Sequence, residues 1–135
     1  MSSRLRDRVC VVTGAARGIG LAIAERFGIE GGRLACVDVS ARRLEPAVEG
    51  LKGKGFEARA YGVDVGDREA VHALFARIES DFAAPVAVLV NNAVFARFEP
   101  LAQITVETVE RMFAVGVHGL IWTTQAAVPQ MERRG

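Results

Sequence analysis

Three closely spaced glycines lie where a short apolar run passes into a helical pattern, in Thr13-Gly14-Ala15-Ala16-Arg17-Gly18-Ile19-Gly20. Gly14 permits a sharp turn, Gly18 lets a pyrophosphate approach the backbone, and Gly20 lets the helix pack close to a sheet. The helix N-terminus then offers free N–H groups and a partial positive charge to phosphates. The turn predicts a dinucleotide diphosphate site, with a plain glycine turn without ligand as the alternative. A P-loop is excluded because no Lys-Ser or Lys-Thr follows.

A carboxylate, Asp38, ends the next apolar run, 24 residues after Gly14. At that position a carboxylate can accept both hydroxyls of an adenosine ribose and repel a 2′-phosphate, which favours NAD over NADP. Arg17 favours NADP instead, because a guanidinium beside the glycines can hold a phosphate. The alternative for Asp38 is a strand-end carboxylate that contacts only water.

Further polar residues end the two following apolar runs. Asp64 can accept a hydrogen bond from an adenine amino group, or it can cap the following helix. Asn91-Asn92-Ala93 ends the last run, where amides can satisfy loop backbone groups and approach a ligand. For Asn92 a structural role and a functional role are equally open.

Four strands separated by helices position these residues. The strands are expected at residues 8–12, 34–39, 58–63 and 86–90, each a short run rich in apolar or β-branched residues. The helices are indicated by apolar spacings of three and four, with the longest running from about Thr105 to about Met131. Ile19, Ile23 and Phe27 share one face of the first helix. Ser40 is expected to cap the second helix, and Pro46 to delay or bend its start.

This alternation predicts an α/β fold of the Rossmann type, a doubly wound parallel sheet in strand order 3-2-1-4. A ligand crevice is then expected between strands 1 and 4, where the winding reverses. Residues 1–135 would form a single partial domain that ends after the fourth strand and the long helix.

The amino-acid composition limits the kinds of ligand, surface and compartment that can be expected for this chain. With a net charge of +1, the chain shows no electrostatic footprint for nucleic acid or a membrane surface. Cys10 and Cys36 lie in apolar runs and are expected to be buried thiols; no metal site is indicated. No signal peptide is evident, and polar residues interrupt the apolar segment 113–128, so a cytosolic, soluble protein is expected. The basic residues at positions 4, 6 and 8 are expected to form a solvated tail.

Taken together, the Thr-Gly-x-x-x-Gly-x-Gly turn, Asp38, Asp64-Val65 and Asn91-Asn92-Ala93 resemble the classical short-chain dehydrogenase/reductase family. The resemblance implies hydride transfer between a nicotinamide and a carbonyl or alcohol substrate, and homo-oligomers formed through the long helix 105–131. It implies that the cofactor phosphates are bound by Gly14, Arg17, Gly18, Ile19 and Gly20, and the ribose by Asp38. It further implies that Asp64 and Val65 contact the adenine, and that Asn91 and Ala93 form the floor of the cleft.

The chain departs from the family pattern in its catalytic residues. The family uses a Ser and a Tyr-x-x-x-Lys beyond the long helix, but the only tyrosine, Tyr61, is followed four residues later by Val65. The position of the family's helical Asn is matched by Gly116, and Val94 stands where Asn-Asn-Ala is usually followed by Gly. We therefore assign no catalytic residue in this chain. His72 is expected on the surface, and His118 in a structural or interface role.

A long helix that is apolar nearly all round, next to an edge strand at 86–90, requires cover. We therefore expect either a fragment of a protein about twice as long or a chain that needs a partner. The leading function is an NAD-dependent oxidoreductase represented by its cofactor-binding portion. The alternatives are a non-catalytic NAD(H)-binding module and, less well supported, a methyltransferase, which needs no phosphate-cradling turn.

Overall fold

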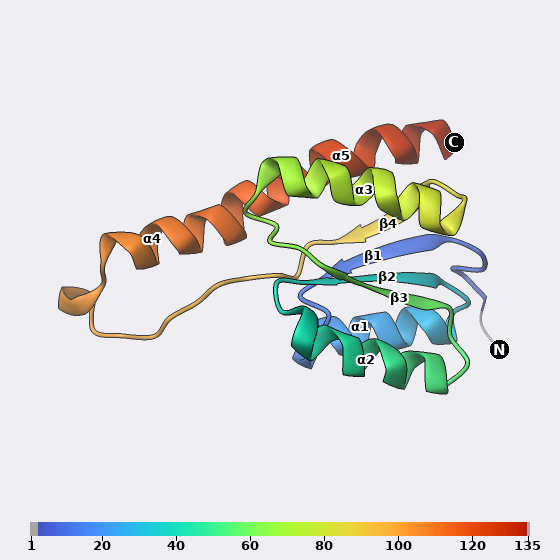
Figure 1. Cartoon of the computed structure of the whole chain (residues 1–135), viewed down its shortest axis with the longest axis horizontal. Coiled ribbons are helices and arrows are strands. Elements are labelled where there is room, and N and C mark those ends of the chain that lie inside the picture. Colours follow the sequence, from blue (N-terminus) through green and yellow to red (C-terminus); the bar gives the residue numbers. More distant parts are fainter. Residues whose placement is uncertain (1–2, 135) are drawn as a thin grey trace.

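A parallel four-stranded sheet forms the centre of the molecule (Figure 1). The computed structural model describes residues 3–134. The strands pair in the order β3-β2-β1-β4, so the predicted Rossmann-type topology is confirmed. Each strand boundary lies within one residue of its predicted position, the strands being β1 (Val9–Thr13), β2 (Arg33–Asp38), β3 (Ala58–Gly62) and β4 (Val86–Val90).

Helices cover both faces of this sheet. Figure 1 shows α1 (Gly18–Ile29) and α2 (Ala41–Gly53) on one side, with α3 (Arg68–Phe82) and α5 (Gly119–Arg134) on the other. Each side has its own apolar core, because side chains alternate along the strands: Val9 and Val11 face α3, whereas Cys10 and Val12 face α1 and α2. The sheet is therefore buried on both faces, as its nearly continuous apolar strands require.

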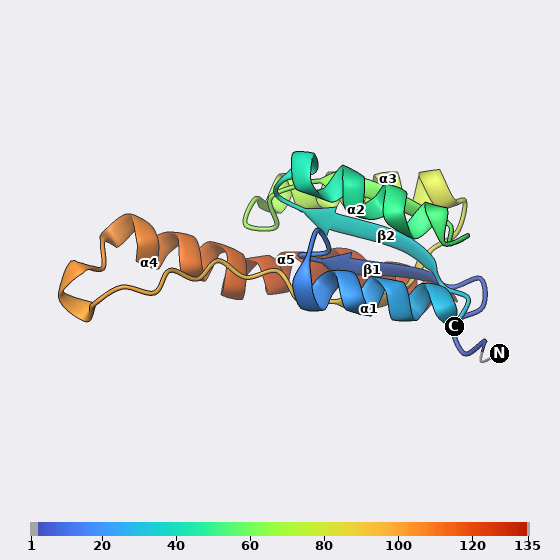
Figure 2. The same ribbon diagram turned by 90° about the horizontal axis from the view of Figure 1, so that it is seen from below.

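The predicted long helix is present but is not uniform. It consists of α4 (Val106–Phe113), one π-helical turn (Ala114–His118) and α5, and Thr105 caps its start by accepting a hydrogen bond from the Thr108 amide. A 3-10 turn, η1 (Leu101–Gln103), precedes it. Figures 1 and 2 show α4 and the segment before it extending well beyond the carboxyl ends of the strands.

Apolar side chains on this extension are exposed, as the all-round apolar pattern predicts. They include Val106 (69 % exposed) and Phe113 (55 %). Strand β4 is at the edge of the sheet, also as predicted. Within residues 3–134 no helix is both long enough and apolar enough to cross a membrane.

Some local expectations are wrong. Ile19 does not join the buried face of α1: its side chain is 72 % exposed, because the helix begins at Gly18 and its first turn faces a cavity rather than the core. Pro46 does not delay the start of α2, which begins at Ala41 with Ser40 as its cap; a bend of the helix at Pro46 stays a prediction. The proline is exposed and the helix continues through it, so the missing N–H is tolerated on the solvent side.

The expected solvated tail and surface histidine also need correction. Arg4 is paired with the buried carboxylate of Glu30, Nη2 to Oε1 at 2.8 Å, and Leu5 donates its amide to the Glu30 carbonyl. The N-terminal segment is thus tied to the end of α1, while Arg6 and Arg8 are exposed as expected. His72 is half-buried, and its Nε2 is enclosed without a hydrogen-bond partner in the described part of the chain.

Candidate functional site

A cavity of about 590 Å³ opens at the carboxyl ends of the strands, where the predicted crevice lies. Eight of the ten predicted binding residues line it; Gly20 and Asn91 do not. The eight are Gly14, Arg17, Gly18, Ile19, Asp38, Asp64, Val65 and Ala93. The fold therefore gathers residues from four separate loops around a single cavity.

Different physical requirements hold at Gly18 and Gly20. Gly18 has φ +57°, and a Cβ built there meets nothing within 4 Å, so its backbone is open on that side. At Gly20 the same construction places Cβ 2.1 Å from the Gly14 carbonyl oxygen and 2.6 Å from Asn92 Nδ2. Gly20 is thus needed for packing of the turn, and Gly18 for access to the backbone.

The start of α1 lacks a side-chain cap. Arg17 occupies the N-cap position and its side chain makes no capping hydrogen bond, whereas Ser40, Asp67 and Thr105 cap α2, α3 and α4. The first turn of α1 contains no acidic residue. Uncapped amides and the positive end of the helix dipole therefore adjoin the cavity, and this arrangement fits a diphosphate.

Asp38 is held by backbone amides at the end of β2. Its Oδ2 accepts a hydrogen bond from the Ala16 amide at 3.3 Å, and its Oδ1 accepts one from the Ser40 amide at 3.0 Å. The alternative in which it contacts only water is therefore wrong. Arg43, in the first turn of α2, also lines the cavity and was not identified from the sequence, because an exposed helical arginine carries no distinguishing pattern.

Asp64 forms an ion pair across the cavity wall. Its Oδ2 accepts a hydrogen bond from Arg111 Nη1 at 2.8 Å, and its Oδ1 accepts one from the Gly66 amide at 2.9 Å. Burial raises the pKa of this carboxyl, but the bonds from Arg111 and Gly66 outweigh it, so the net pKa is below the ordinary value. The capping alternative is wrong for Asp64, because Asp67 caps α3 by accepting from the Ala70 amide.

The two asparagines after β4 make different contacts. Asn92 Nδ2 donates to the carbonyls of Thr13 (3.1 Å) and Gly14 (3.3 Å), so this side chain braces the glycine turn against β4. Asn91 turns towards the long helix, where its Oδ1 accepts from Thr123 Oγ1 at 2.6 Å. The Asn91 side chain therefore does not line the cavity, while Asn92 both lines it and shapes it.

The remaining described residues of the cavity wall are apolar: Val37, Val39, Val63, Val94, Phe95, Ala96 and Val115. Val94 is 75 % exposed at the rim, next to Phe95. Gly116 lies in the π-helical turn, is exposed, and does not line the cavity. In the described part of the chain, no group of three or more His, Cys, Asp or Glu side chains is arranged to hold a metal ion.

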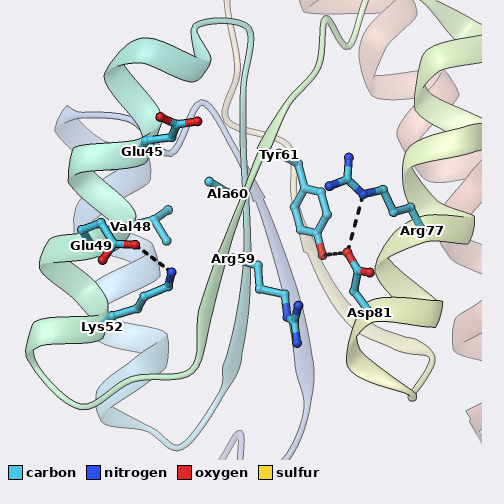
Figure 3. Close-up of a pocket in the computed structure, with 9 residues that line it drawn as sticks. All are labelled: Glu45, Val48, Glu49, Lys52, Arg59, Ala60, Tyr61, Arg77 and Asp81. Carbon is cyan, nitrogen blue, oxygen red and sulfur yellow. Dashed lines mark hydrogen bonds and ion pairs between the residues drawn. The ribbon is translucent and has the colours of Figure 1, made fainter.

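A second cavity, of about 410 Å³, lies at the free edge of β3 (Figure 3). Tyr61 points from β3 towards α3, where its hydroxyl donates to Asp81 Oδ2 at 2.9 Å, and Arg77 pairs with the same carboxylate. Burial, and then this hydrogen bond, raise the pKa of Tyr61 well above its ordinary value. The charges around it are largely paired with one another, and Tyr61 does not line the first cavity.

The family model described as short chain dehydrogenase matches residues 8–135. A galactitol 2-dehydrogenase (L-tagatose-forming) of Cereibacter sphaeroides is 38 % identical over 132 residues, which are 98 % of this chain and 50 % of the relative. The chain thus spans about half the length of the curated relatives it matches.

Solved structures agree with this match. An L-sorbose reductase from Gluconobacter frateurii, complexed with NADPH and L-sorbose, superposes with a TM-score of 0.90 at 33 % identity and covers 100 % of this chain and 51 % of its own. An NAD⁺-bound xylitol dehydrogenase superposes with a TM-score of 0.89 at 33 % identity, with 97 % and 50 % covered. Similar folds thus accept either dinucleotide.

Proposed function

The chain belongs to the short chain dehydrogenase family, and on that premise we propose that it is the cofactor-binding portion of an NAD-dependent oxidoreductase. The main support is the start of α1, which has no side-chain cap and adjoins a cavity beside the open backbone of Gly18. A bound nicotinamide dinucleotide supplies hydride transfer, which none of the protein's own side chains can perform. The protein's part is to bind and orient it.

Each predicted residue has a role in this proposal. Gly14, Gly18 and the first amides of α1 hold the diphosphate, and Arg17 adds positive charge beside it. Asp38, already fixed by two amides, accepts the ribose hydroxyls with its remaining lone pairs. Asp64 accepts from the adenine amino group. Ile19, Val65 and Ala93, which also line the cavity, are proposed as further contacts. Gly20 is proposed to act through packing of the turn, and Asn91 through its bond to Thr123 on the long helix.

NAD is proposed over NADP because the Asp38 carboxylate opposes a 2′-phosphate. Arg17 and Arg43 line the same cavity and act against this preference. The preference therefore depends on whether the fixed carboxylate outweighs two flexible guanidinium groups. We expect that it does, because two backbone amides hold the Asp38 carboxylate in place beside the cavity.

Calorimetric titration of the chain with NAD and with NADP tests both parts of the proposal. We expect NAD to bind more tightly, and Asp38→Asn to weaken NAD by about tenfold, the worth of one hydrogen bond to a charged group. Glu49→Gln is the matched control, because this surface carboxylate pairs with Lys52 and does not line the first cavity. No binding of either dinucleotide at millimolar concentration would refute the proposed function, and tighter NADP binding would refute the NAD preference.

The substrate of the whole protein is proposed to be a small carbonyl compound or secondary alcohol, as the names of the relatives indicate for those proteins.

The exposed apolar side chains of α4 and α5 are proposed to form a homo-oligomer interface. Analytical ultracentrifugation tests this: a stable monomer at high concentration would argue against it. A cytosolic location is also proposed, and cell fractionation tests it.

A further inference from the structure

Arg111 connects the long helix to the loop that follows β3. The Arg111–Asp64 ion pair joins residues 47 apart in the sequence, and both side chains line the first cavity. In residues 3–134, Arg111 is the only α4 side chain that hydrogen-bonds to a residue beyond the helix and its Thr105 cap. The basic side chain of α4 is thus directed at a single carboxylate in the cavity wall.

The loop and the helix are pressed together around this pair. A Cβ at Gly66 would lie 3.3 Å from the Ala114 carbonyl oxygen, and a Cβ at Gly119 would lie 2.8 Å from Val65 Cγ2. The loop after β3 and the long helix are therefore in close contact at both ends of the π-helical turn, at Gly66 against Ala114 and at Val65 against Gly119. The loop holding Asp64 has little freedom to shift relative to the long helix.

The Asp64 carboxylate is consequently held at both oxygens. Arg111 occupies one lone pair of Oδ2, and the Gly66 amide occupies one of Oδ1. A carboxylate has about four acceptor sites, so two remain, and the side chain cannot rotate without breaking one of these bonds. Because Arg111 also favours the ionised form, the free sites accept hydrogen bonds and do not donate them.

We propose that Arg111 is a positioning residue that fixes Asp64 for recognition of the amino group of an adenine base. The inference rests on the proposed function and adds to it a residue on the long helix, outside the recognised turn and strand-end motifs. A base with an amino donor is bound, whereas hypoxanthine, which presents a carbonyl at the same position, meets a fixed negative charge. Arg111 of the long helix thereby contributes to the specificity for the base.

The test compares NAD with nicotinamide hypoxanthine dinucleotide by calorimetric titration of the full chain. We expect the wild type to prefer NAD by about tenfold, the value of one hydrogen bond to a charged group. Arg111→Met should weaken NAD by about fivefold and leave the hypoxanthine dinucleotide nearly unchanged, so that the preference falls to about twofold. Arg133→Met breaks an ion pair with Glu79 away from the cavity and should leave both affinities unchanged.

A merely structural role for Arg111 would lower both affinities together and keep the preference, and that result overturns the inference. Arg111→Gln, which retains a polar side chain, decides the case if the Met variant does not fold. In an Asp64→Asn background, Arg111→Gln should have no further effect on base preference; an additive effect also overturns the inference. If the wild type binds neither dinucleotide, the proposed function itself fails.

Discussion

Replacing Gly18 and Gly20 separately by alanine distinguishes access to the backbone from packing of the turn. At Gly18, alanine would clash with nothing in the protein but would keep φ near +57°. Left-handed backbone costs an L-residue about 1–2 kcal/mol, and the stiffer unfolded chain returns about 0.4–1 kcal/mol. The expected net loss for Gly18→Ala is therefore about 1 kcal/mol, which lowers Tm by roughly 4 °C in a domain of this size.

At Gly20 the added methyl would lie 2.1 Å from the Gly14 carbonyl oxygen, so backbone must move. Such overpacking costs about 3 kcal/mol or more when neither partner can move aside. Gly20→Ala should therefore lose about three times as much stability as Gly18→Ala. Gly50→Ala is the control, because Gly50 lies in α2 with nothing within 4 Å of a Cβ, and it should gain about 0.5–1 kcal/mol.

Urea unfolding measures the stabilities, and calorimetric titration with NAD measures binding. The folded Gly18→Ala variant should bind NAD at least tenfold more weakly, because its methyl group stands where a phosphate would approach the amides. Wild-type affinity in this variant would refute the role of Gly18. Equal stability of the Gly18 and Gly20 variants would refute the separation of roles.

Three further outcomes are expected. Gln130→Leu should lower the free energy of unfolding by about 1–3 kcal/mol in urea titrations, because it leaves the buried Val86 N–H of β4 unsatisfied and removes an additional hydrogen bond to the Phe75 carbonyl of α3; a loss below about 0.5 kcal/mol would contradict this. Burial raises the pKa of Cys10 to about 11 and of Cys36 to about 12, so a thiol reagent at pH 8 should label the folded chain far more slowly than the urea-unfolded chain, and equal rates would refute burial. The pKa of Asp64 is lowered in the folded state, so its bond with Arg111 stabilises the fold above the unfolded pKa near 4 and is lost as pH falls through the folded value. The stability difference between wild type and Arg111→Met should therefore shrink below about pH 4, whereas a difference that does not change with pH would indicate another cause.

Strand order and the glycine turn followed from local patterns, because buried parallel strands are short apolar runs and a phosphate-binding turn needs glycine at set spacing. The placement of Asp38 and Asp64 beside one cavity followed from the same reasoning, since the carboxyl ends of parallel strands meet at one edge. Ile19 shows the limit of helical periodicity: an apolar residue in the correct phase is exposed because the first turn extends past the core.

Tertiary structure alone decided the contacts between segments distant in sequence. Arg111 reaches Asp64 across 47 positions, and Gln130 reaches the Val86 amide across 44. Neither pairing has a local signature, because each depends on how the long helix crosses the sheet and on its π-helical turn. The residue types and their spacing therefore determined which elements form, whereas helix packing determined which side chains meet at the cavity wall.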